Sequence, residues 1–183
     1  SWYIQAIKNY VNFSGRARRK EYWMFFLFTV IFTILAMILD FVLGIDFRIS
    51  VYDEVAHWNY NYKPEVSLGY GPIYVIVSLF HWLPTMSAAV RRLHDSDRTG
   101  WWFFAPSLIM LTAIFIGAIF IGGGMATNSD SMAITGGILA GVLYLVGIGL
   151  GITSFVFLFF DGTKGDNRFG VSHKYDSEGN LLA

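Results

Sequence analysis

Residues 91–102 read RRLHDSDRTGWW and hold a dense group of chemically active side chains. Arginine guanidiniums bind phosphate or carboxylate groups through paired hydrogen bonds. The adjacent His94 and Asp95 are residue types that act as acid, base or metal ligand. This stretch therefore predicts one of three things: an ion-pair network, a site for an anion, or a catalytic site.

Two further charged segments are expected on the same side of a membrane, FSGRARRKEYW at 13–23 and DGTKGDNRFG at 161–170. If residues 91–95 are helical, Asp95 lies four residues from Arg91 and within reach of Arg92. We expect the acidic and amide groups to organise the arginines, and a phosphate or an anionic lipid headgroup to bind them. The expected organisers are Glu21, Asp95 and Asn167, and the candidate headgroup-binding residues are Arg16, Arg19, Arg91, Arg92, His94, Arg98 and Arg168.

Few patterns in the chain are typical of an enzyme. No H-E-x-x-H, G-x-S-x-G or P-loop sequence is present. His94 and Asp95 are adjacent, so on a helix they point about 100° apart and make a poor metal pair. DGTKGDN lacks the twelve-residue pattern of a calcium loop. We expect no metal and no cofactor, and we favour a binding protein over an enzyme.

The composition indicates that a lipid bilayer surrounds the elements that position these residues. The chain has 183 residues, of which 55% are apolar and only 14% are charged, with a mean hydropathy of +0.50. Soluble domains carry about 25% charged residues. The net charge is zero, so the broad basic field of a nucleic-acid-binding protein is missing, and no nucleic-acid partner is expected.

Four segments approach or exceed the roughly 20 apolar residues that cross a bilayer. We expect an all-α membrane protein with four transmembrane helices, preceded by an amphipathic helix that lies on the inner leaflet or packs on another cytoplasmic segment. Residues 1–170 would form one membrane domain and 171–183 a cytoplasmic tail. The expected spans are 23–43, 71–90, 101–121 and 134–160.

Lysine and arginine predict the orientation. Eleven of the thirteen lie before the first span, between the second and third, or after the fourth, and two lie in the remaining connections. Both termini and the 91–100 segment are therefore expected in the cytoplasm. The long connection 44–70 is expected outside, where its alternating residues ISVYDEV could form a short hairpin or lie in the membrane interface.

Polar and small residues inside the spans suggest further roles. His81 lies near the middle of the second span, and Pro84 frees the carbonyl of Phe80, so local polar bonding is expected there. Asp40 lies within a turn of the outer interface, where its carboxylate is expected to reach water or headgroups. The fourth span carries two G-x-x-x-G pairs that allow close packing within the bundle or in a homodimer, namely Gly137 with Gly141 and Gly147 with Gly151.

The three charged segments resemble the signature segments of the domain of unknown function 805 family, small bacterial inner-membrane proteins. The resemblance covers Phe13 to about Gly170, and the long connection 44–70 departs from many relatives. It implies a fold and a location in the bacterial inner membrane, and it implies no chemistry. The matching residues are Phe13, Gly15, Arg16, Arg19, Glu21 and Trp23, then Arg91, Arg92, Leu93, His94, Asp95, Arg98, Gly100, Trp101 and Trp102, and finally Gly162, Gly165, Asn167, Arg168 and Gly170.

These observations leave three hypotheses for the function. The first is a binding or accessory protein whose cytoplasmic arginine-rich face engages anionic lipid headgroups or a membrane-protein partner. The second is a small transporter or channel that uses His81 and Asp40. The third is a lipid-modifying enzyme that uses His94 and Asp95. A homo-oligomer is compatible with each of them.

Overall fold

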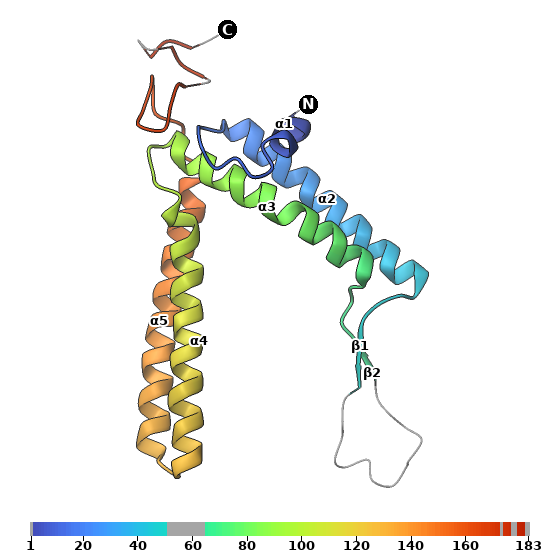
Figure 1. Cartoon of the computed structure of the whole chain (residues 1–183), viewed down its shortest axis with the longest axis vertical. Coiled ribbons are helices and arrows are strands. Elements are labelled where there is room, and N and C mark those ends of the chain that lie inside the picture. Colours follow the sequence, from blue (N-terminus) through green and yellow to red (C-terminus); the bar gives the residue numbers. More distant parts are fainter. Residues whose placement is uncertain (1, 51–64, 173, 177–178, 182–183) are drawn as a thin grey trace. The chain divides into compact units, whose positions relative to one another are not determined.

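The computed structural model describes residues 2–50, 65–172, 174–176 and 179–181 (Figure 1). Four of its helices are long and apolar enough to cross a membrane, and the N-terminal helix is short. The expected all-α membrane fold is confirmed. In chain order, the described elements are α1 (Trp2–Lys8), α2 (Arg19–Leu43), β1 (Arg48–Ser50), β2 (Glu65–Ser67), α3 (Pro72–Asp95), α4 (Trp101–Thr127) and α5 (Asp130–Phe157).

The helices differ from the expected spans mainly at their ends. Helix α3 continues through Asp95 rather than stopping near residue 90, because residues 91–95 contain no helix-breaking residue. The helix ends at Asp95, and two residues later Asp97 has a left-handed φ of 56°. The RRLHD sequence therefore lies on the last turns of a helix, which fixes the direction of each of its side chains.

The chain divides into two compact units, one of residues up to Val11 with Trp23–Thr85, and one of Asn12–Tyr22 with Met86 onward. In the first unit, α1 packs through the ring of Tyr3, which stacks on Phe25 of α2 with ring centroids 5.5 Å apart. The hydroxyl of Tyr10 donates a 2.8 Å hydrogen bond to the carbonyl of Phe80. This is the carbonyl that Pro84 leaves free, so the expected polar bonding near the proline is confirmed.

Asp40 joins the end of α2 to the start of α3 in the same unit. Its carboxylate is fully buried and accepts hydrogen bonds from the backbone N–H groups of Gly71, Ile73 and Tyr74, at 2.8–3.1 Å. The expectation that this carboxylate reaches water or headgroups is wrong. The first N–H groups of α3 have no partner within their own helix, and Asp40 satisfies them.

A short antiparallel hairpin follows this junction. Strand β1 pairs with β2, with Arg48 opposite Ser67. Of the two alternatives for this connection, a short hairpin or a segment in the membrane interface, strand pairing is present for residues 48–50 and 65–67. Most of the ISVYDEV sequence lies outside the described residues.

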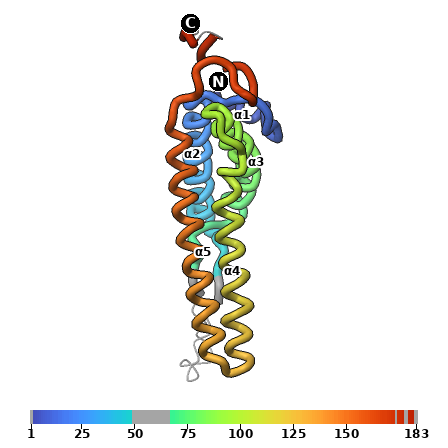
Figure 2. The backbone as a smooth tube through the Cα atoms, turned by 90° about the vertical axis from the view of Figure 1, so that its left-hand side faces the viewer, coloured from blue at the N-terminus to red at the C-terminus, as the bar shows by residue number. Residues whose placement is uncertain are grey.

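In the second unit, α4 and α5 form an antiparallel pair that runs side by side in both views (Figures 1 and 2). Gly147 of α5 is buried, and a Cβ there would lie 2.5 Å from Met110 of α4. Gly136, which the G-x-x-x-G pattern did not single out, similarly packs on Phe120. Small residues thus let the two backbones approach closely.

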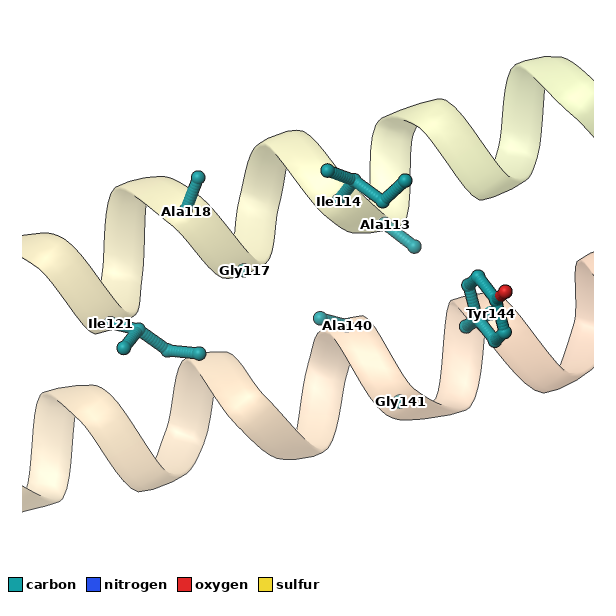
Figure 3. A pocket seen from close by; sticks show the side chains of 8 residues that line it. All are labelled: Ala113, Ile114, Gly117, Ala118, Ile121, Ala140, Gly141 and Tyr144. Carbon is teal, nitrogen blue, oxygen red and sulfur yellow. The ribbon is translucent and has the colours of Figure 1, made fainter. Parts of the chain in front are cut away.

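The other predicted packing glycines are placed differently. A Cβ at Gly151 would touch only Pro106, at 3.8 Å, and one at Gly137 or Gly141 would meet no atom of the described chain within 4 Å. Gly141 instead lines an open groove of about 370 Å³ with Ala113, Gly117 and Tyr144 (Figure 3). The packing face of α5 is therefore set one residue away from Gly137, since a single step along a helix turns a side chain by about 100°.

Candidate functional site

Three segments that are far apart in the sequence meet within the second unit. They are residues 12–22 with the first turn of α2, the last turns of α3, and the connection after α5. The backbone N–H of Ala17 donates to the carbonyl of Arg91, and the N–H of Thr163 donates to the carbonyl of Asp95. These bonds fix both outer segments to the end of α3.

Asp95 is the centre of the buried contacts. Its Oδ1 accepts from Nε of Arg16 at 3.0 Å, and its Oδ2 accepts from Nη1 of Arg92 at 2.5 Å. The carboxyl side chain is about 11% exposed. A buried ion pair is stable only when its remaining polar atoms are also satisfied. Both oxygens of Asp95 are therefore occupied by cations that the fold itself supplies.

Arg16 satisfies that condition with backbone carbonyls. Its Nη1 donates to Gly165 at 2.8 Å, and its Nη2 donates to Thr163 at 2.9 Å and to Asp95 at 3.3 Å. The residue is 3% exposed. The guanidinium thus ties the 161–170 turn to the end of α3, and it has no donor directed at solvent.

Arg92 binds the end of α5 in the same way. Its Nε donates to the carbonyl of Leu158 at 3.1 Å and its Nη2 donates to the carbonyl of Phe160. The residue is fully buried. Carbonyl groups at a helix C-terminus lack partners in the helix and carry partial negative charge, so a cation stabilises them.

Arg91 pairs with Glu21 on the first turn of α2, at 2.9 Å, rather than with Asp95. Both side chains are almost completely buried. Nε and Nη2 of Arg91 are buried and have no hydrogen-bond partner among the described residues. Together, Arg16, Arg91, Arg92, Glu21 and Asp95 form what we call the buried charge network, with three guanidiniums and two carboxylates.

His94 lies beside this network and is held by the 161–170 turn. Its ring stacks on that of Phe169, with centroids 3.9 Å apart, and its Nδ1 is 3.2 Å from the carbonyl of Gly15. The side chain of Asn167 donates to the backbone carbonyl of His94 at 2.9 Å. The turn itself closes through reciprocal backbone bonds between Asn167 and Gly170.

Two glycines allow the segments to approach this closely. A Cβ at Gly162 would lie 2.6 Å from Cγ of Asp95, and a Cβ at Gly100 would lie 2.7 Å from a methyl group of Val90. Sequence reasoning matched both glycines to motifs but gave neither a place in the site. Phe169 was missed as well, and its position beside Arg168 in the NRFG sequence is the signal that could have found it.

Three arginines, which we call the rim arginines, remain accessible at the edge of the network. Arg19 pairs with Asp161 at 3.4 Å, and its side chain is 47% exposed. Arg168 pairs with Asp97 at 3.1 Å and is 57% exposed. Arg98 is half-buried, with its guanidinium 3.8 Å from the ring centroid of Phe157. Exposed ion pairs of this kind contribute about 0–1 kcal/mol, so another anion can replace their carboxylates.

Asp161 has a perturbed acidity at this rim. Partial burial opposes its ionisation, but the hydrogen bond from Lys174 and the charge of Arg19 outweigh burial, so its pKa lies below the ordinary value. Lys174 donates to this carboxylate at 2.6 Å. Asp161 is therefore ionised at neutral pH and competes with any anion for Arg19.

The predicted intramembrane polar residues, His81 and Asp40, belong to the other unit and make none of these contacts. Across the described ranges, no three His, Asp or Glu side chains gather as a metal site requires. The arrangement offers anion binding at the rim and structural charge pairing beneath it.

Comparison with known proteins shows the family to which the chain belongs. Residues 10–171 match the model of a family described as protein of unknown function (DUF805). The chain belongs to this family. In this DUF805 protein, every residue of the buried charge network and every rim arginine lies within the matched range.

Two relatives from Escherichia coli K12 are similar to this DUF805 protein. Inner membrane protein YhaI is 30% identical over 179 residues, which cover 96% of this chain and 98% of that protein. Inner membrane protein YhaH is 41% identical over 101 residues, which cover 55% of this chain and 68% of that protein. No solved structure matches the chain.

Proposed function

We propose that this integral membrane protein is an accessory protein of the bacterial inner membrane that binds anionic lipid headgroups on the cytoplasmic side. The observation that carries the proposal is the accessibility of the rim arginines Arg19 and Arg168. Each side chain is about half exposed and pairs with a partly exposed carboxylate. Each also donates to one backbone carbonyl, that of Phe159 for Arg19 and that of Asp97 for Arg168. A lipid phosphate offers the same paired acceptor geometry and, like the carboxylate, a full negative charge.

The local charge balance supports an anionic ligand. Residues 12–22, 91–100 and 158–176 contain ten lysines and arginines and six acidic residues. A lysine or arginine at the surface of an anionic leaflet contributes about 1 kcal/mol to lipid attraction. The proposed cytoplasmic position of this charge rests on the distribution of lysine and arginine along the chain.

The candidate arginines fall into a buried group, which we assign to the scaffold, and an accessible group, which we assign to lipid binding. Arg16 and Arg92 direct their guanidiniums at internal carboxylates and carbonyls, and Arg91 is enclosed with Glu21. We assign these three arginines to the scaffold. Lipid binding falls to the rim arginines, and His94 and Asn167 hold the turn that carries Arg168.

Native mass spectrometry of the full chain, released from nanodiscs of mixed phosphatidylglycerol and phosphatidylcholine, tests the proposal. We expect preferential retention of phosphatidylglycerol, and we expect a several-fold loss of that preference in the double variant Arg19→Ala, Arg168→Ala. Arg48→Ala is the matched control, because Arg48 is also about half exposed and paired with a nearby aspartate, but belongs to the β1 strand. Equal preference in all three proteins would refute headgroup binding at the rim.

The contacts favour neither alternative function. A lipid-modifying enzyme would need Asp95 to accept a proton, and both of its oxygens already accept from arginines. A transport path through Asp40 would break three hydrogen bonds that begin α3. Proton or solute flux in liposomes that falls in a His81→Ala variant would favour transport over our proposal.

A further inference from the structure

A second groove lies in the first unit, and no arginine is among its lining residues. It has a volume of about 350 Å³ and is bounded by α1, α2 and α3. Ligand sites are typically apolar hollows of at least about 300 Å³ with a few polar groups that fix orientation. The lining residues are Tyr3, Phe32, Leu35, Ala36, Leu39, Ile73, Val77 and His81.

The lining forms two parallel stripes with a polar group at one end. Residues 32, 35, 36 and 39 share one face of α2, and residues 73, 77 and 81 share one face of α3. Seven residues of helix span about 10 Å. Tyr3 and His81 supply the polar atoms next to Phe32, and Leu39 and Ile73 line the opposite end. The groove therefore suits a molecule with one polar group and a hydrocarbon tail.

The hydrogen bonds at the polar end determine which polar group fits. Nδ1 of His81 lies 2.8 Å from the carbonyl oxygen of Val77, which can only accept, so Nδ1 carries a proton. In the neutral ring Nε2 is then an acceptor, and the hydroxyl of Tyr3 donates to it at 2.8 Å. The single proton of that hydroxyl is used, and the oxygen of Tyr3, a residue that lines the groove, retains acceptor capacity.

We infer that this groove binds a membrane-soluble alcohol, a hydroxyl group on a long hydrocarbon tail, with the hydroxyl donating to the oxygen of Tyr3. A ketone, ester or ether has no proton to donate and would leave this acceptor unused. An anionic head is disfavoured because the lining residues contain no cation. The α4–α5 groove offers no equivalent pair, since Tyr144 is its only lining side chain with a polar atom (Figure 3).

The test uses a long-chain alcohol that carries a diazirine in its tail, and the O-methyl ether of the same compound. Both are photo-crosslinked to the full-length protein in nanodiscs over a concentration series, and the labelled residues are mapped by mass spectrometry. We expect labelling at the groove residues, with half-saturation at a concentration about threefold to tenfold lower for the alcohol, because one hydrogen bond separates the two ligands.

Variants separate the polar end from the tail. Replacing Tyr3 and His81 together by phenylalanine removes both polar atoms, so the alcohol and the ether should then label equally. Leu39→Trp should fill the groove and reduce labelling by both compounds. Leu27→Trp is its control, because Leu27 lies on the same helix, is similarly exposed and does not line the groove.

Equal labelling of the wild-type protein by alcohol and ether would overturn the inference without any variant, so it stays refutable even if a double variant fails to fold. Labelling that maps outside the groove, or that Leu39→Trp leaves unchanged, would overturn it as well. The site shares no residue with the rim arginines, so its failure leaves the proposed headgroup binding intact.

Discussion

Replacing Asp95 by asparagine keeps the volume of the side chain and removes the charge that two buried guanidiniums share. Arg16 and Arg92 would both lose their anionic partner. One of them would keep a hydrogen bond to the amide oxygen, and the other would face the amide N–H₂ group, donor against donor. A hydrogen bond to a charged group contributes about 1.5–3 kcal/mol, and breaking a buried ion pair costs about 3–5 kcal/mol. We therefore expect the Asp95→Asn variant to lose about 3–5 kcal/mol of unfolding free energy.

Asp97→Asn is the matched control for this prediction. Asp97 lies two residues away and also pairs with an arginine, but its side chain is 46% exposed, so its loss should cost about 0–1 kcal/mol. Both variants and the wild type can be compared by reversible unfolding in detergent micelles with a graded denaturant. If Asp95→Asn were no less stable than Asp97→Asn, the network would not be a buried structural element, and our reasoning about Arg16 and Arg92 would be refuted.

Three further predictions concern other contacts. Gly162→Ala should lower the unfolding free energy by about 1–3 kcal/mol, because its Cβ would overlap Asp95. Gly149→Ala is the control and should cost nothing, because a Cβ there would meet open space. The thermal midpoints of both variants measure these effects. Asp40→Asn should lower the unfolding free energy by about 1–3 kcal/mol, because an amide has one acceptor oxygen for three N–H donors. Arg48→Ala, a change at an exposed residue of the hairpin, is its control, and equal thermal midpoints of the two variants would contradict this prediction. The pKa of Asp161 is lowered on folding, so its contribution is present above the unfolded pKa of about 4 and is lost as pH falls through the lower folded value. The difference in midpoint between wild type and Asp161→Asn should therefore shrink below about pH 4, and a difference that grew on acidification would show the opposite sign of shift.

The helical membrane fold followed directly from the sequence because hydropathy acts over whole segments. Twenty apolar residues indicate a span wherever their neighbours lie. The ends of the helices were harder to predict. Helix α3 continues through Asp95, since arginine and leucine, which fill three of the five positions 91–95, are good helix formers although they do not extend the apolar segment. Gly136 rather than Gly137 packs on α4 because a one-residue shift changes the face, and hydropathy is insensitive to such a shift.

Individual partners in the site were not predictable where they are backbone groups. The spacing of the charged residues predicted that Arg92 could pair with Asp95, because both would lie on one helix. It gave no indication that the other nitrogens of Arg92 bind carbonyls beyond α5, because carbonyls are the same in every residue. Asp40 is the same case, a carboxylate whose partners are three N–H groups more than thirty residues away.

The dependence of Arg16 and Arg92 on residues 158–165 has a consequence for biogenesis. Both arginines are translated well before these carbonyls, and α5 is the last of the four long helices to leave the ribosome. Until α5 is inserted, the two guanidiniums have only Asp95 as an internal partner, and water must solvate the rest. The nascent protein therefore completes its charged end only after the four long helices among the described residues have been made, so formation of the contacts at residues 158–165 follows insertion of these four helices.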